Sequence, residues 1–125
     1  MDITLYGIPN CDTVKKARAW LAENKVGYCF HDFKKAGVTR ELLSGWLAAL
    51  PWQSLVNTRG TTWRGLPQAQ RDAIVDAESA IALMQASPSV IKRPVLATGY
   101  AVHVGFSSDM YAQICSDVIR IPQNR

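Results

Sequence analysis

The fold is decided by residues 5–16, which read LYGIPNCDTVKK. A short apolar run, 3–6, ends in a glycine and a proline, and Cys11 follows directly after this turn signal. Apolar residues then recur at the three- and four-residue spacing of a helix, namely Val14, Ala17, Leu21 and Ala22. The pattern predicts a buried strand, a tight loop and a helix that extends to about Asn24, with Cys11 at the helix N-terminus.

A thiol at a helix N-terminus faces backbone N–H groups that have no partner inside the helix, and it faces the positive end of the helix dipole. Both stabilise the thiolate, which is the nucleophilic form of cysteine. Lys15 and Lys16 add positive charge nearby, and Asp12 or Thr13 is expected to cap the helix. Cys11 is therefore a candidate nucleophile. The alternative at this stage is a loop cysteine that happens to precede a helix.

The overall composition is that of a globular domain. The chain has 125 residues, of which 48% are hydrophobic and 19% charged, so it is long enough for one domain with a proper core. No apolar run approaches the roughly 18 residues that would suggest a membrane span. The N-terminal segment has neither the basic nor the long apolar region of a signal peptide. We expect a cytoplasmic, bacterial protein that does not associate with membranes.

The formal net charge is +4, and the basic residues are dispersed along the chain. A nucleic-acid-binding domain usually gathers them on one dense face with aromatic residues between, so direct nucleic-acid binding is not expected. A small anionic substrate or an acidic partner protein fits this charge equally well.

The three cysteines, Cys11, Cys29 and Cys115, are far apart and form no Cys-x-x-Cys pair. This predicts neither a disulfide framework nor a zinc site, and no metal or bound cofactor is expected. Cys29 alternates with aromatic residues and is expected to be a small core residue. Cys115 is expected on the last helix. His31 has no companion at metal-ligand spacing and is interpreted as structural.

The rest of the chain predicts an α/β fold. A second strand at 26–33 completes a right-handed βαβ unit. Helices are then expected after Thr39, over 52–56, from Pro67 through Ile74 and Val75, and from Asp76 or Glu78 to about Ser87. Strands at 91–97 and 101–105 and a helix after Ser107 or Ser108 close the chain. This order, βαβ and ββα around a four-stranded mixed sheet, predicts a thioredoxin-like core at 1–35 and 91–119 with an all-helical insertion at 38–90.

Four stretches carry a family resemblance. They are YGIPNCDTVKKA at 6–17, NTRGTTWR at 57–64, IKRPV at 91–95 and VGFS at 104–107. With these stretches the sequence resembles the arsenate reductase (ArsC)/Spx family, and within it the YffB-like members. The resemblance covers about residues 2–115.

The resemblance implies a role for several residues. Cys11 occupies the position of the catalytic cysteine, and Arg93 that of an arginine that helps to bind the oxyanion. Pro94 corresponds to the cis proline of thioredoxin-like folds, and Arg59 lies where the family supplies another anion-contacting arginine. Glutathione and glutaredoxin are the electron donors of the related arsenate reductases.

The chemistry of such a site supports these roles. An anion in a partly desolvated pocket needs matching charge, which arginine supplies through planar, bidentate hydrogen bonds. A thiolate that attacks an anion meets like-charge repulsion, which nearby cations offset. Lys15, Asn10 and Thr13 flank Cys11 and are further candidates for anion binding.

The sequence also departs from the family pattern. Arsenate reductases have a histidine four positions before the cysteine, where this chain has Gly7, and a third arginine near the last helix, where it reads Val104-Gly105-Phe106. The resemblance therefore does not identify arsenate as the substrate. Spx regulators have a second cysteine at the position of Val14, so an internal disulfide with that position is excluded. The resolving thiol then comes from Cys29, Cys115 or another molecule, and glutathione is the simplest choice.

Two functions follow from these residues. The leading hypothesis is a thiol-dependent reductase, with glutathione as the expected co-substrate and Cys11 as its nucleophile. The alternative is an Spx-like transcriptional regulator that binds RNA polymerase without a Cys-x-x-Cys switch. A family member that has lost catalysis is a third possibility.

Overall fold

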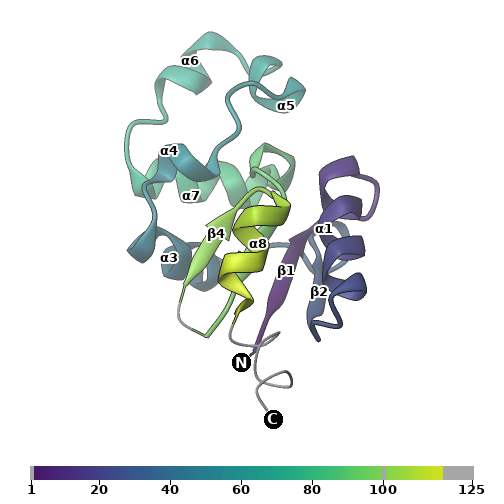
Figure 1. Cartoon of the computed structure of the whole chain (residues 1–125). Helices are drawn as coiled ribbons and strands as arrows, with labels where there is room; N and C mark the ends of the chain where they lie inside the picture. The colour runs from purple at the N-terminus through teal and green to yellow at the C-terminus, as the bar shows by residue number, and fades with distance from the viewer. Residues whose placement is uncertain (1, 100, 117–125) are drawn as a thin grey trace. The chain divides into compact units, whose positions relative to one another are not determined.

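The computed structural model describes residues 2–99 and 101–116 (Figure 1). Contacts divide the chain into two units, the first made of 1–32 with 93–125 and the second of 33–92. The last residues of the predicted core segment 91–119, namely 117–119, lie outside the described residues. Within the two described ranges, no helix combines the length and the apolar character needed to cross a membrane.

The first unit contains a four-stranded mixed sheet. Its elements are β1 (Thr4–Gly7), α1 (Asp12–Glu23), β2 (Cys29–Asp32), β3 (Val95–Ala97), β4 (Val102–Val104) and α8 (Ser108–Ile114). The strand order is β2-β1-β3-β4, in which β1 and β2 are parallel and the other neighbours antiparallel. The predicted thioredoxin-like α/β fold is confirmed.

The helices α1 and α8 pack on one face of this sheet. Leu5 of β1 and Leu96 of β3 are opposite one another in the register and fully buried. They share a core cluster with Ala17 and Leu21 of α1 and Tyr111 of α8. Burying an aliphatic side chain of this size contributes about 1.5–3 kcal/mol, so this cluster fixes the helices on the sheet.

The second strand begins later than the sequence predicted. Val26, the first residue of the predicted strand, instead completes the C-terminus of α1. The N–H of Val26 donates to the carbonyl oxygen of Leu21 at 2.9 Å, and that of Lys25 donates to Ala22 at 3.1 Å. This is a Schellman motif, in which Lys25 takes the left-handed conformation with φ 57°.

The third strand is also shorter than predicted, because it starts at Val95 instead of Ile91. Ile91 forms an isolated antiparallel bridge with Val56 inside the second unit. The N–H of Lys92 donates to the carbonyl oxygen of Leu55 at 2.7 Å. Ile91 and Lys92 therefore pair with residues of the second unit, and the chain enters the sheet only at Val95.

The second unit is helical and spans 33–92, whereas the predicted insertion has the bounds 38–90; Phe33 begins a short helix and does not end the second strand. Its elements are α2 (Phe33–Ala36), α3 (Arg40–Ala49), α4 (Trp52–Leu55), α5 (Thr61–Arg64), α6 (Gln68–Asp72), α7 (Ala77–Ala86) and the 3-10 turn η1 (Pro88–Val90). The buried Trp46 of α3 packs on Phe33, with ring centroids 6.4 Å apart.

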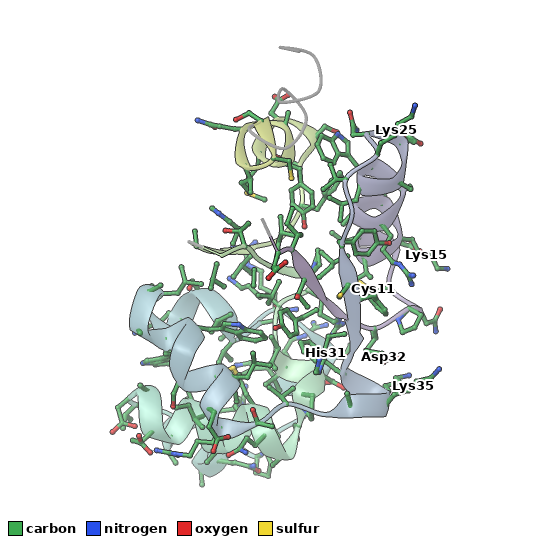
Figure 2. All side chains as sticks on the ribbon, turned by 90° about the horizontal axis from the view of Figure 1, so that it is seen from below. Cys11, Lys15, Lys25, His31, Asp32 and Lys35 are labelled. Carbon is green, nitrogen blue, oxygen red and sulfur yellow. The ribbon has the colours of Figure 1, made fainter. Side chains whose placement is uncertain are left out.

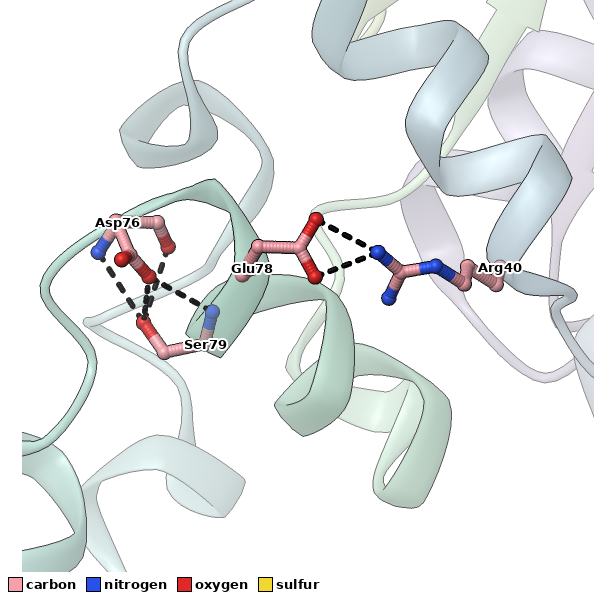
Figure 3. Close-up of polar contacts among 4 residues, drawn as sticks. All are labelled: Arg40, Asp76, Glu78 and Ser79. Atoms are coloured by element: carbon pink, nitrogen blue, oxygen red, sulfur yellow. Dashed lines mark hydrogen bonds and ion pairs between the residues drawn. The ribbon is translucent and has the colours of Figure 1, made fainter.

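Caps place the longer helices of this unit. Thr39 is the N-cap of α3, and its hydroxyl accepts from the N–H of Leu42 at 3.1 Å, as predicted. Asp76 caps α7 in a capping box with Ser79 (Figure 3). Arg40 of α3 donates to both carboxylate oxygens of Glu78 in α7, at 2.6 and 2.5 Å (Figure 3).

The helix predicted from Pro67 through Val75 is wrong in its extent, because α6 ends at Asp72. The N–H of Val75 donates to the Ser79 hydroxyl at 3.0 Å and therefore belongs to the cap of the next helix. Ile74 also lies outside α6, and the Val75 side chain is 70% exposed. The capping box at Asp76 thus overrides the apolar pattern.

Candidate active site

Cys11 itself is the N-cap of α1, which corrects the expectation that Asp12 or Thr13 would cap the helix. Its backbone is extended, with φ −131° and ψ 126°, and its carbonyl oxygen accepts from the N–H of Lys15 at 2.9 Å. At an N-cap, the side chain lies where a Ser or Asp oxygen would accept from the second or third helical N–H. The Cys11 side chain therefore projects from the residue that faces the free N–H groups of the first turn, although it makes no capping hydrogen bond of its own.

The surroundings of Cys11 favour its thiolate. Partial burial is the largest single influence and raises the pKa of the thiol. Hydrogen bonds from the backbone N–H of Val14, from the Arg93 side chain and from the backbone N–H of Thr13 lower it, as does the charge of Arg93. Together these outweigh burial, and the pKa of Cys11 is lowered. A lowered pKa is the condition for the role of Cys11 as a nucleophile, and that role remains a prediction.

Arg93 reaches Cys11 from the segment that leads into β3. It is half-buried and precedes the buried Pro94, and the peptide bond between them is cis, as the resemblance implied. The carbonyl oxygen of Pro94 accepts from the N–H of Gly105 at 2.8 Å. The Gly105 carbonyl oxygen in turn accepts from the Tyr111 hydroxyl at 3.3 Å. Hydrogen bonds therefore link the backbone next to Arg93 to Gly105, the residue after β4, and through Gly105 to Tyr111 of α8.

The other predicted anion-binding residues are exposed. Asn10 lies in the turn before α1, Thr13 in the first turn of the helix, and Lys15 on its outer side (Figure 2). The positive charge that acts on the thiol comes from Arg93. The roles of the three flanking side chains in anion binding remain predictions.

Arg59 belongs to the second unit. It is exposed on the segment between α4 and α5, where its N–H donates to the Asn57 side-chain oxygen at 3.2 Å. Its anion-binding role also remains a prediction.

Cys29 is exposed, so the expectation of a core residue is wrong. It is the first residue of β2, at the sheet edge, and it pairs with Thr4 at the start of β1. Cys11 follows the opposite end of β1, beyond Gly7. Since a strand rises about 3.4 Å per residue, the two cysteines are separated by more than the roughly 7 Å between Cα atoms that a disulfide tolerates.

Cys115 is a fully buried free thiol that follows the last turn of α8. It shares the core cluster with Ile3 and Val26, and burial raises the pKa of its thiol. Its inert surroundings are those of a structural cysteine. Neither Cys29 nor Cys115 is therefore placed to resolve an intermediate on Cys11.

His31 lies near the same end of the sheet as Cys11. It pairs with Tyr6 in the register of β1 and β2, and the ring centroids are 4.9 Å apart. Burial raises the pKa of Tyr6. Figure 2 shows His31 and Asp32 at this end of β2. The ring contact agrees with the structural interpretation of His31.

Two contributors to the site were missed by the sequence analysis. From the sequence alone, Gly7 is interpreted as a turn signal and Val14 as an apolar helix position, and relatives have a histidine and a second cysteine at these two positions. In the structure Val14 supplies an N–H to the thiol, and its side chain lies against Gly7. The glycine at the strand end was the available signal, since glycine often marks a close backbone approach.

The sheet order, the cis proline and the cysteine at the start of α1 define a thioredoxin-like α/β protein. The chain belongs to the ArsC family, whose model matches residues 6–114.

Solved structures and curated proteins resemble this chain over most of its length. A YffB protein is 53% identical, with a TM-score of 0.85, covering 89% of this chain and 96% of its own. An arsenate reductase (ArsC) related protein from Brucella melitensis is 49% identical, with a TM-score of 0.72 and coverages of 90% and 93%. The global transcriptional regulator Spx of Streptococcus pneumoniae is 27% identical, covering 86% of this chain and 80% of its own.

Proposed function

We propose that the protein is a thiol-dependent reductase that uses Cys11 as its nucleophile and a small external thiol, glutathione, as its reductant. The observation that carries this proposal is the Cys11 thiol, whose pKa is lowered by the N–H of Val14 and by Arg93. A lowered pKa raises the fraction of thiolate at neutral pH, where free cysteine, with a pKa near ~8.5, is only a few per cent ionised.

In the first step the Cys11 thiolate attacks an oxidised centre of an anionic substrate. A bond forms between the sulfur and that centre, and one substrate oxygen leaves as water after protonation. Glutathione thiolate then attacks the Cys11 sulfur. The electron pair of the sulfur–substrate bond remains on the substrate, which is thereby reduced by two electrons, and a mixed disulfide forms on Cys11.

A second thiol completes the cycle. It attacks the glutathione sulfur of the mixed disulfide, releases the Cys11 thiolate and leaves with glutathione as a disulfide. Cys29 and Cys115 are badly placed for this step, so the second thiol comes from another glutathione molecule or from glutaredoxin.

Arg93 has two tasks in this mechanism. It stabilises the thiolate before the reaction, and its planar donors bind the substrate anion or a glutathione carboxylate during it. Cations that match charge as it develops in a partly desolvated site contribute strongly to catalysis. Arg59 is proposed as a second anion contact.

A second candidate function is transcriptional regulation through RNA polymerase. It is favoured by the 27% identity to the Spx regulator over 86% of this chain. Passing the protein over immobilised RNA polymerase α C-terminal domain tests it, and specific retention would support regulation. If the protein elutes with an inert control, this candidate is excluded.

The reductase is tested by an assay that contains glutathione, glutaredoxin and a panel of oxidised anions that includes arsenate. Production of glutathione disulfide is followed with glutathione reductase and NADPH. We expect turnover with at least one anion, loss of at least about 10³-fold in Cys11→Ser, and unchanged turnover in Cys29→Ser. Turnover that survives in Cys11→Ser would exclude the proposed mechanism.

A further inference from the structure

Gly7, the last residue of β1, is buried against the first turn of α1. A Cβ atom at this position would lie 2.8 Å from Cγ2 of Val14 and 3.5 Å from its Cγ1. Carbon atoms in protein cores pack best about 3.5–4.0 Å apart, so even a methyl group at position 7 collides with Val14.

The backbone itself does not demand glycine at this position. Among the described glycines, the left-handed region is occupied by Gly37 and Gly105, and not by Gly7. The close approach of β1 and α1 is therefore what excludes a side chain at position 7.

Val14 cannot yield easily to such a collision. Its side chain is fully buried, and it is branched at Cβ, which leaves essentially one favoured χ1 rotamer in a helix. A methyl group at position 7 therefore displaces the first turn of α1 more readily than it rotates the Val14 side chain. That turn carries the N–H groups of Thr13 and Val14, which face the N-cap residue Cys11 and lower the pKa of its thiol.

We propose that Gly7 is a positioning residue: by lacking a side chain it lets the first turn of α1 seat against β1, and so holds the N–H groups of Thr13 and Val14 at the Cys11 sulfur. Gly7 acts through Val14 and does not touch a reacting atom. Its catalytic meaning rests on the proposed function, whereas its effect on the thiol is measured without any substrate.

The test compares the pH dependence of Cys11 alkylation by iodoacetamide, with the modified peptide quantified by mass spectrometry. We expect Gly7→Ala to shift the alkylation midpoint upward, toward that of free cysteine, and to slow alkylation severalfold at pH 7. The double variant Gly7→Ala/Val14→Ala removes the colliding Cγ2 methyl group of Val14 together with Cγ1 and is expected to restore the wild-type midpoint. Gly27→Ala is the matched control, because a Cβ at Gly27 meets no atom within 4 Å.

A merely structural role of Gly7 would lower the melting temperature and leave the midpoint unchanged. A folded Gly7→Ala protein with the wild-type midpoint overturns the proposal. If Gly7→Ala does not fold, the double variant decides, since a midpoint that stays raised without the Val14 methyl groups also overturns it.

These outcomes are separate from failure of the proposed function. If Cys11 of the wild-type protein has an alkylation midpoint at or above that of free cysteine, the thiol is not activated and the proposed function fails. If the wild-type midpoint is low and Gly7→Ala leaves it unchanged, the positioning role of Gly7 is refuted and the proposed function is not affected.

Discussion

The Arg93 side chain lies beside the Cys11 thiol, and its charge and hydrogen-bonding capacity lower the pKa of that thiol, so the residue before the cis proline meets the residue that caps α1. The two come from opposite ends of the sequence and are brought together by β1 and β3, which are neighbours in the sheet. This pair unites the nucleophile and the cation that the proposed chemistry requires.

Removal of the Arg93 charge tests this pair. We expect Arg93→Met to raise the pKa of Cys11 and to lower turnover by about 10²-fold or more, because a charged donor at the reacting site is lost. The turnover and the Cys11 pKa of Arg93→Lys are expected to lie between those of wild type and those of Arg93→Met, since lysine keeps the charge but not the planar donors. The measurements are the alkylation pH profile and kcat/KM. Lys16→Met, which removes an exposed charge from α1, is the control, and an equal effect of both changes would argue against a specific role.

Oxidation tests the separation of the three cysteines. After diamide treatment at low protein concentration, we expect peptide maps under non-reducing conditions to lack a Cys11–Cys29 or Cys11–Cys115 disulfide. With glutathione present, a mixed disulfide on Cys11 is expected. An intramolecular Cys11–Cys29 crosslink in the folded protein would contradict the external resolving thiol.

Lys25 offers a test of the end of α1. Because it has a φ of 57°, a conformation that costs a non-glycine residue roughly 1–2 kcal/mol, Lys25→Gly is expected to raise the free energy of unfolding by about 1 kcal/mol. Urea denaturation measures this change. Gly27→Ala, a change at an open position, is expected to stay within about 0.5 kcal/mol of wild type. A loss of stability in Lys25→Gly would refute the interpretation of this cap.

The capping box of α7 predicts a pH-dependent stability. Hydrogen bonds from the N–H and hydroxyl of Ser79 lower the pKa of Asp76. A carboxyl group with a lowered pKa stabilises the fold above its ordinary pKa of about 3.9, and this contribution is lost as the pH falls through the lowered value.

We therefore expect Asp76→Ala to lower the melting temperature at pH 6, with a smaller difference from wild type at pH 3. Asp76→Ser retains a capping oxygen without a charge. It is expected to lower the melting temperature less than Asp76→Ala does at pH 6, and its difference from wild type should shrink at pH 3 in the same way, since both variants lack the titrating carboxyl. Equal destabilisation by Asp76→Ala at both pH values would show that the charge of the cap does not contribute.

Local patterns predicted much of this fold because they have local causes. The helical spacing after Cys11 and the caps at Thr39 and Ser107 depend on near neighbours in the chain, and each is present as expected. The errors arose where two local signals competed. At Val75 the apolar pattern favoured α6, but the cap of α7 took the backbone N–H.

The site was predictable where its function depends on residue type. Cys11 and Arg93 were identified by their chemistry and by the family resemblance. The contributions of Val14 and Gly7 come from a backbone N–H and from a missing side chain, which carry no chemical signature in a sequence. The exposure of Cys29 depends on the place of β2 at the sheet edge, which the order of strands along the chain does not specify.

The central claim is that Cys11 is an activated thiolate, and the most direct measurement is its alkylation rate as a function of pH in the folded wild-type protein. Peptide mass spectrometry distinguishes Cys11 from the other two thiols in the same sample, and a cysteine model peptide provides the reference. We predict a midpoint for Cys11 below the ~8.5 of free cysteine, with the buried Cys115 modified most slowly. A Cys11 midpoint at or above that of the model peptide would contradict the claim.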